Sequence, residues 1–237
     1  MAVKKQINTA ETEARIDTLT LPQDGWSAAS RADALARLRA MGLPGRRDEY
    51  WKFTRPDALV QATAATAEVV NNDETPLMDG EPCLRAVFVD GVFDADASDD
   101  LALEGIEISR LADTTADIHW AQSLHGTLET AGQTPVARPI AALVTAFATD
   151  GLLIRVTGNP SKPVNVIYNR TSDNADVMLH HVIKLEQGAS LTLLESGPAA
   201  ARLSTVMEVD VADTAAFHHV RTQGRDHQRL AATHLFG

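Results

Sequence analysis

Hydrophobic residues follow two different periods along the chain, and the change falls at Gly151. Before it, apolar residues from Ile140 to Phe147 stand at positions i, i+3, i+4 and i+7, which predicts an amphipathic helix. Pro139 suits the first turn of this helix, and Gly151 ends it. After Gly151 apolar and polar positions alternate to the last residue, which predicts strands.

The first half of the chain carries weaker patterns. Leu35, Leu38 and Met41 predict a helix that begins near Ser30, and a second helix is expected over 118–128. Residues 1–25 are expected to form a frayed lead-in, and 56–80 a loop. Residues 84–89 are apolar enough for a short strand.

The predicted strands after Gly151 recur with a regular spacing. They start near Leu152, Val164, Met178, Ser190, Ser204, Ala215 and Arg229. Every second strand therefore recurs after 25 or 26 residues, which is typical of stacked turns. The spacing predicts one set of inward columns with Ile154, Leu179, Thr205 and Leu230, and with Val156, His181, Met207 and Ala232. A second sheet is expected to stack Val166, Leu191 and Phe217, and Tyr168, Leu193 and His219.

These columns favour a mainly β protein, a parallel β-helix with two strands per turn, preceded by a mixed α/β N-terminal region. The expected division is 1–150 for the helical and mixed region and 151–237 for the start of the β-helix core. An antiparallel sandwich is the alternative, because it also uses short strands with frequent turns. It gives no reason for a 26-residue repeat.

Composition narrows the class of protein. The 237 residues are 44% hydrophobic and 22% charged, which excludes collagen-like, disordered and disulfide-rich chains. Cys83 is the single cysteine, so an internal disulfide and a four-cysteine zinc site are excluded. A reducing compartment fits this cysteine usage.

The net charge of -11 is concentrated in one segment. Residues 68–117 hold 14 acidic side chains against Arg85 and Arg110, a net of -12. Nucleic acid and anionic membranes are therefore poor partners, because binding them calls for a basic surface. The start of the chain lacks a signal peptide and no apolar run is long enough to span a membrane, so we expect a cytoplasmic protein. The acidic segment is expected to aid solubility and repel wrong partners.

Motifs of the common enzyme classes are missing. The sequence has no GxxxxGK[ST], GxGxxG, HExxH or GxSxG, so neither catalytic nor cofactor-binding residues are predicted. Asp94–Asp100 resembles a calcium loop, but Asp99 and Gly105 stand where an EF-hand needs glycine and glutamate. We interpret it as a solvated acidic loop. The Asn169–Thr171 sequon is interpreted as chance, since no signal sequence precedes it.

Histidines are the candidates for a metal site, although the sequence does not identify which residues would bind the metal. Six fall in the strand region: His180, His181, His218, His219, His227 and His234. Adjacent residues on a strand point to opposite faces, so neither His–His pair can supply two ligands to one ion. Ordinary core or surface histidines are the simpler interpretation. Outward-facing His180 and His218 remain candidates for an interface site, which titration with ferrous iron or zinc would test.

Two further features have structural and functional interpretations. Glu195 and Arg221 are 26 residues apart and are expected to form an exposed pair on successive turns, a structural detail. Trp51, flanked by Tyr50 and Lys52, is either an interface anchor or the residue that fixes the N-terminal helix to the body.

The segment Gly42–Thr54, GLPGRRDEYWKFT, resembles a characteristic motif of the SufD family of iron-sulfur cluster assembly proteins. Gly45 stands where that family usually has threonine. The resemblance continues over 88–93, 139–151 and 185–195, and so covers most of the chain from about residue 30. The strand segments are shared with the related SufB family, whereas the position of the first motif and the lack of cysteines in the repeats favour SufD.

The resemblance implies a right-handed parallel β-helix and a non-enzymatic scaffold that pairs with SufB and acts with the ATPase SufC. It implies no cofactor bound by this chain alone and an iron-sulfur cluster held transiently on the complex. Members of the family are longer and continue to a C-terminal domain that docks SufC. No residue here matches those later segments, so no site is transferred from them.

Two other functions remain open. Many β-helices are polysaccharide lyase-like enzymes, which would need an acid–base pair converging in a groove. A general protein-interaction solenoid is the third possibility. The apolar strand pattern over 231–237 has no capping helix, which predicts a fragment or an open end that pairs with a second copy as a homodimer.

Overall fold

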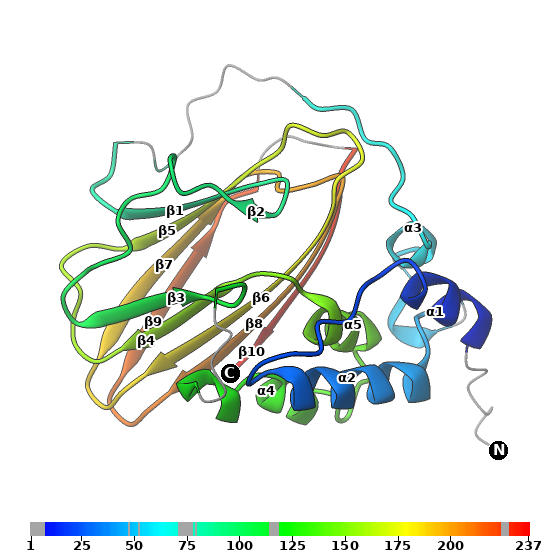
Figure 1. Cartoon of the computed structure of the whole chain (residues 1–237), viewed down its shortest axis with the longest axis horizontal. Coiled ribbons are helices and arrows are strands. Elements are labelled where there is room, and N and C mark those ends of the chain that lie inside the picture. The colour runs from blue at the N-terminus through cyan, green and yellow to red at the C-terminus, as the bar shows by residue number, and fades with distance from the viewer. Residues whose placement is uncertain are drawn as a thin grey trace.

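The computed structural model describes residues 8–46, 48–51, 53–70, 78, 80–113, 119–223 and 228–237. In the first half, helical elements come before and after a group of strands, and in the second half strands follow one another (Figure 1). The helices are α1 (Thr9–Ile16), α2 (Ala28–Met41), η1 (Glu49–Trp51), α3 (Asp57–Val60), η2 (Trp120–Ser123), α4 (Thr127–Ala131) and α5 (Pro139–Phe147). The strands are β1 (Leu84–Val89), β2 (Val92–Phe93), β3 (Ile106–Arg110), β4 (Leu152–Val156), β5 (Val164–Asn169), β6 (Asp176–Leu185), β7 (Ser190–Ser196), β8 (Arg202–Val211), β9 (Ala216–Arg221) and β10 (Leu230–Phe236).

The strands form two five-stranded sheets. One has the order β2-β1-β5-β7-β9 and the other β10-β8-β6-β4-β3. Pairing is parallel except at β1–β2 and β3–β4. The sheets face each other across a common core, in which Phe88 and Leu191 of the first sheet pack with Ile154, Leu179 and Met207 of the second.

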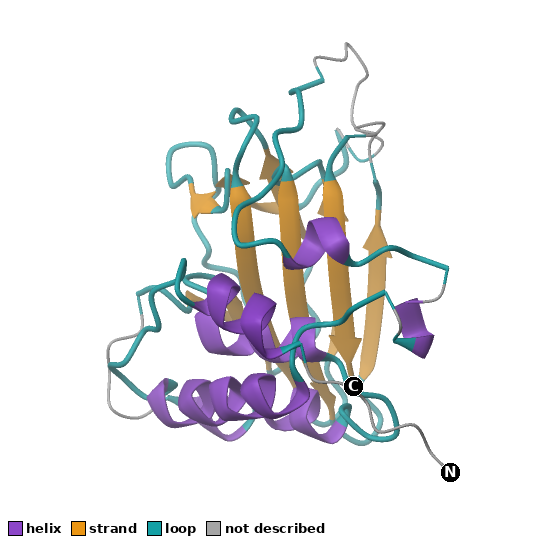
Figure 2. Ribbon diagram, turned by 90° about the vertical axis from the view of Figure 1, so that its right-hand side faces the viewer, coloured by secondary structure: helices purple, strands orange, loops and turns teal. Residues whose placement is uncertain are grey.

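Helices lie against part of the outer face of the second sheet, over β6, β8 and β10 (Figure 2). Helix α5 is buried along its whole length, between α2 on one side and β6 and β8 on the other. Arg31 of α2 fixes this arrangement, because its guanidinium donates to the carbonyl oxygens of Ala146 and Ala148 at 3.0 and 2.8 Å. Strand β6 is therefore covered on both faces, by the first sheet and by helices.

The prediction of a mainly β protein with a right-handed parallel β-helix is wrong. The described chain is mixed α/β, with two mixed sheets and a layer of helices. The repeat spacing after Gly151 left out the strands of the first half, of which β1 joins one sheet and β3 joins the other with antiparallel pairing. The antiparallel sandwich is also wrong, because pairing inside both sheets is mostly parallel.

The individual strands were predicted better than their assembly. Each strand expected after Gly151 is present, and alternate strands pair in parallel. The register is right for His181 with Met207 and for Leu193 with His219, but Ile154 pairs with Ile183 instead of Leu179. The physical reason is the length of β6: only its second half pairs with β4, and its first half extends beyond it.

The helix predictions also have mixed outcomes. The helices near Ser30 and at Pro139 are confirmed as α2 and α5. The expected helix over 118–128 begins outside the described residues, and its described part is divided into η2 and α4 by Gly126, which has a φ of +78°. The frayed lead-in is wrong over Thr9–Ile16, where tertiary contacts stabilise α1: buried Arg15 lies 2.7 Å from the Asp176 carboxylate. Of the helices in the described residues, none combines the length and apolarity that crossing a membrane requires.

Candidate functional site

Four polar side chains meet in the core between the two sheets. They are Tyr168 of β5, His181 of β6, Glu195 of β7 and His219 of β9, called here the Glu195 cluster. The Tyr168 hydroxyl donates to Glu195 Oε1 at 2.6 Å, and His219 Nε2 lies 2.6 Å from Glu195 Oε2. His181 Nε2 lies 3.1 Å from the Tyr168 hydroxyl. Tyr168, His181 and Glu195 are 2%, 2% and 1% exposed, so this network lies in the core itself.

The hydrogen bonds of the Glu195 cluster have a fixed direction. The backbone N–H of Leu152 donates to His181 Nδ1 at 3.0 Å, which places the proton of the neutral ring on Nε2. His181 Nε2 therefore donates to the Tyr168 oxygen, and Tyr168 donates to Glu195. Both carboxylate oxygens of Glu195 thus accept hydrogen bonds, and the cluster satisfies its own polar groups.

Electrostatics favour one ionised group at the centre of the cluster. Burial by itself would raise the pKa of Glu195, but the hydrogen bond from His219 and the nearby His181, Arg221 and Tyr168 lower it to about 2. Burial lowers the pKa of His181, against the opposing effect of Glu195 and Asp150. Burial and the Glu195 carboxylate raise the pKa of Tyr168 well above its ordinary value. At neutral pH the cluster therefore combines a carboxylate with a neutral tyrosine and a neutral His181.

A glycine allows the strands of the cluster to approach closely. Gly197 follows β7 and has a φ of +103°, a conformation that other residues rarely adopt. A Cβ atom at this position would lie 1.9 Å from the carbonyl oxygen of Tyr168. Only glycine therefore lets the end of β7 pass the end of β5 at the distance that the cluster needs.

A second polar cluster lies on the other face of β6, beneath the helices. His180 Nε2 is 2.8 Å from Glu208 Oε2, and Glu208 also accepts from the backbone N–H groups of Gly126 and Glu129 at 2.6 and 2.9 Å. The ring of His125 stacks on His180 with 4.2 Å between centroids. Burial lowers the pKa of both histidines well below the ordinary value and raises that of Glu208. These groups form the His180 cluster.

The His180 cluster contains the residue types of a catalytic triad without its connections. Ser30 Oγ is 2.8 Å from His125 Nδ1, so a serine and a histidine are in contact. His125 meets His180 through its ring face, however, and no described hydrogen bond joins His125 to Glu208. Activation of a serine requires one imidazole that contacts both the hydroxyl and the carboxylate. The geometry thus suits a polar contact between helices and sheet.

The predicted opposite orientations of adjacent histidines are confirmed. His181 and His219 face the core, whereas His180 and His218 face away from it. The prediction that His180 is available at an interface is wrong, because α-helical segments cover it and it is 0% exposed. His218 is exposed, and His227 lies outside the described residues. Within the described part of the chain, no group of three or more His, Cys, Asp or Glu side chains is arranged to hold a metal ion.

Glu195 and Arg221 are register partners on β7 and β9, as the sequence spacing predicts. The expectation of an exposed pair is wrong, because the Glu195 side chain points into the core. Arg221 instead donates to Thr233 Oγ1 at 2.8 Å, across to the other sheet.

The remaining sequence candidates lie on the surface. Asp94 Oδ1 accepts from the backbone N–H groups of Asp96 and Ala97, and Asp99 accepts from Arg85, so carboxylates close the acidic loop from within. In the sequon, Asn169 is exposed and the Thr171 hydroxyl donates to Asp90.

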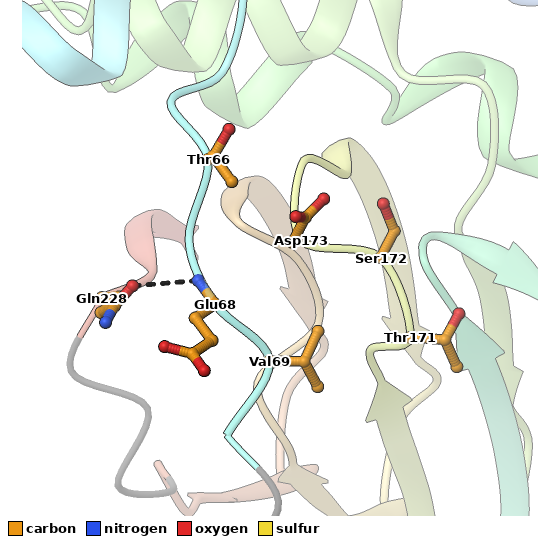
Figure 3. Close-up of a pocket in the computed structure, with 7 residues that line it drawn as sticks. All are labelled: Thr66, Glu68, Val69, Thr171, Ser172, Asp173 and Gln228. Atoms are coloured by element: carbon orange, nitrogen blue, oxygen red, sulfur yellow. Dashed lines mark hydrogen bonds between the residues drawn. The ribbon is translucent and has the colours of Figure 1, made fainter.

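Two surface hollows lie apart from both clusters. One, of about 550 Å³, is drawn in Figure 3 and is bordered by Glu68, Asp173, Gln228 and several hydroxyl side chains. The Glu68 N–H donates to Gln228 Oε1 at 2.9 Å there, and none of the described residues around this hollow is basic. The other, of about 630 Å³, contains Cys83 among polar and charged neighbours. Neither hollow is lined by a residue of the Glu195 cluster or of the His180 cluster.

Comparison with known proteins gives no match, either to a protein-family model or to a curated protein.

Sequence reasoning found four of the seven residues of the two clusters. It singled out His180, His181, Glu195 and His219. It placed Tyr168 in a stacked column without a polar role, and it named neither His125 nor Glu208. Glu208 has a signal in retrospect, since it shares a strand face with buried Val206, and a buried acid needs a partner. His125 has no such signal, because its partner is 55 residues away on another element.

Proposed function

We propose that this chain is a non-enzymatic scaffold subunit of iron-sulfur cluster assembly, which pairs with SufB and acts with the ATPase SufC in the cytoplasm. The observation that carries the proposal is the open edge of each sheet. Strands β9 and β10 each pair on one side only within the described sheets, and they expose Val220 and Leu235 at 48% and 54%. Unpaired strand edges with apolar side chains favour addition of a partner chain.

The segments that resemble the SufD family support the proposal by their places in the fold. Leu43 of the first segment is 1% exposed in the helical core, and its N–H donates to Thr12 Oγ1 at 2.8 Å. Asp90 and Gly91 make the turn between β1 and β2, and Asp150 joins α5 to β4 while it binds Arg110 at 2.6 Å. The resemblance therefore falls on residues that determine how the elements join.

The polar interior also fits a scaffold. The Glu195 cluster binds its own donors and acceptors, and the His180 cluster ties helices to sheet. In this proposal the iron-sulfur cluster is cargo of the assembled complex, and this chain alone holds no cofactor.

Co-expression with SufB and SufC tests the proposal. We expect the chain to co-purify with both and to elute with them in one peak of size-exclusion chromatography. Leu235→Lys places a charge on the open strand β10 and should abolish the complex. Val92→Lys is the matched control, because Val92 is 69% exposed on β2, at the opposite edge of the other sheet. Failure of the unmodified chain to bind, or equal loss in both variants, would contradict the proposal.

The alternatives gain less support from the geometry. A polysaccharide lyase-like enzyme needs its acid–base pair in a groove, whereas the described pairs Glu195–His219 and Glu208–His180 lie in the core or under helices. A general interaction protein would use the same strand edges but would not select SufB. Homodimers through these edges are a further proposal, and light scattering of the isolated chain measures them.

A further inference from the structure

A small hollow lies where Tyr50, Trp51 and Thr54 meet the start of α5. It measures about 130 Å³, and its walls include Tyr50, Trp51, Thr54, Arg138, Pro139 and His234. The hollow is therefore lined by Tyr50 and Trp51 of the aromatic motif that the sequence singles out. Neither polar cluster explains a role for this motif.

The rim of the hollow carries a cation, the guanidinium of Arg138. The Arg138 guanidinium lies over the Tyr50 ring, 5.4 Å from its centroid. Among the described residues, no acidic side chain forms an ion pair with it. His234 adds no charge at neutral pH, because burial lowers its pKa to about 4. A ligand carboxylate would thus meet one arginine held against an aromatic face, the arrangement that suits Arg–carboxylate pairing.

Aromatic surface continues outside the hollow. Tyr50 is 62% exposed and Phe53 is 93% exposed, whereas Trp51 is partly buried and packs against the hydrophobic core of the helices. Exposed aromatic side chains next to arginine are enriched where proteins bind proteins. The two interpretations of Trp51 therefore apply to different residues of this segment. Trp51 itself fixes the segment to the body, and Tyr50 and Phe53 present apolar surface.

Size and charge identify the occupant. Sites for metabolites and drug-sized ligands measure about 300 to 1,000 Å³, so a hollow of about 130 Å³ suits a single side chain. Residues 46–55 carry four basic and two acidic side chains, in a chain whose net charge is -11. A locally positive segment favours an acidic partner.

We propose that this hollow binds an acidic segment of a partner protein in which a bulky apolar residue stands beside a carboxylate. The apolar side chain fills the space between Trp51 and Pro139, and the carboxylate pairs with Arg138. The inference does not depend on the role in iron-sulfur cluster assembly, since it rests on the hollow and on Arg138 alone.

Titration of the isotope-labelled full chain with short peptides tests the inference by ¹H–¹⁵N NMR. The probe is acetyl-Asp-Leu-Asp-amide, with acetyl-Lys-Leu-Lys-amide and acetyl-Asp-Gly-Asp-amide as comparisons. We expect saturable shifts of the Trp51 indole N–H and of the backbone around Arg138 at peptide concentrations of about 1 mM, with smaller effects from either comparison peptide. Hexanoate, a carboxylate with an apolar tail, tests for a small-molecule site.

Arg138→Gln should weaken the acidic peptide at least about tenfold. Arg155→Gln is the matched control: Arg155 lies on β4, its side chain is 38% exposed, and it pairs with Glu186. Tyr50→Ala is a second variant at an exposed position and should also weaken binding. Three results would each overturn the inference: no shift with the acidic peptide, equal shifts with the basic peptide, or hexanoate binding as tightly as the peptide.

Discussion

Replacing Glu195 by glutamine removes the carboxylate charge of the Glu195 cluster and keeps the size of the side chain. In the wild-type chain both oxygens accept hydrogen bonds, from Tyr168 and His219. A glutamine amide accepts only at its oxygen, so one of these donors loses its acceptor. The substitution therefore tests whether the ionised carboxylate stabilises the fold.

The magnitude follows from the pKa of Glu195, which falls from an ordinary value of 4.5 to about 2. At about 1.4 kcal/mol per pH unit, this depression corresponds to about 3 kcal/mol of folding free energy at pH 7. A lowered carboxyl pKa contributes stability that is fully present above pH 4.5 and is lost as pH falls towards 2. Domains are stable by about 5 to 15 kcal/mol, so Glu195→Gln removes a large share.

Urea unfolding followed by circular dichroism measures this effect between pH 7 and pH 3. We expect Glu195→Gln to unfold about 3 kcal/mol more easily than the wild type at pH 7, and the difference to fall to less than about half at pH 3. Glu186→Gln is the matched control, because Glu186 is an acid on the surface that pairs with Arg155 at 3.0 Å. Its effect should be much smaller, since exposed ion pairs contribute little.

Two results would refute the reasoning. If Glu195→Gln and Glu186→Gln destabilise the protein equally at pH 7, burial and the hydrogen bonds of the Glu195 cluster add nothing to the free energy of unfolding. If the loss in Glu195→Gln stays constant from pH 7 to pH 3, the effect is one of shape and the carboxylate charge contributes nothing.

Two further measurements examine the core. Burial lowers the pKa of His180 and His181 below 6.5, so the unfolded chain binds more protons below that pH and stability should fall from pH 7 to pH 5, by up to about 1.4 kcal/mol per pH unit for each histidine. The raised pKa of Glu208 has the opposite effect on stability. An increase of the urea midpoint from pH 7 to pH 5 would contradict the prediction for the histidines. Gly197→Ala should cost more than about 3 kcal/mol or prevent soluble expression, because of its contact with the Tyr168 carbonyl. Gly45→Ala, with nothing within 4 Å of the added Cβ, should unfold at nearly the wild-type urea concentration.

Helices and strands are predicted correctly from the sequence where one hydrophobic period continues over several neighbouring residues. Helix α5 shows its period of 3.6 with proline at the start, and the strands after Gly151 show their period of 2. Helix α1 escapes prediction because its stability comes from distant contacts, such as that of Arg15 with Asp176. Strand β3 is missed for a similar reason: it lies in the acidic segment, and its antiparallel partner β4 is distant in the sequence.

The candidate site is predictable only in part, since periodicity tells which residues share a face but not what covers that face. The pattern places His180 and His181 on opposite sides of β6, and the structure confirms this. It also predicts that His180 faces solvent, as the outer face of a strand would in a simple stack. Helix α5 and the residues around His125 cover that face instead.

Because β6 is covered on both faces, its polar side chains lie in the interior of the protein. A strand buried on both faces has no solvent side for its polar residues, so each must find a partner inside the protein. His181 does so in the Glu195 cluster and His180 with Glu208. Replacing either histidine by a hydrophobic residue would leave a buried carboxylate or hydroxyl short of a partner. The two clusters therefore fix the distance between the sheets on one side of β6 and the seating of the helices on the other.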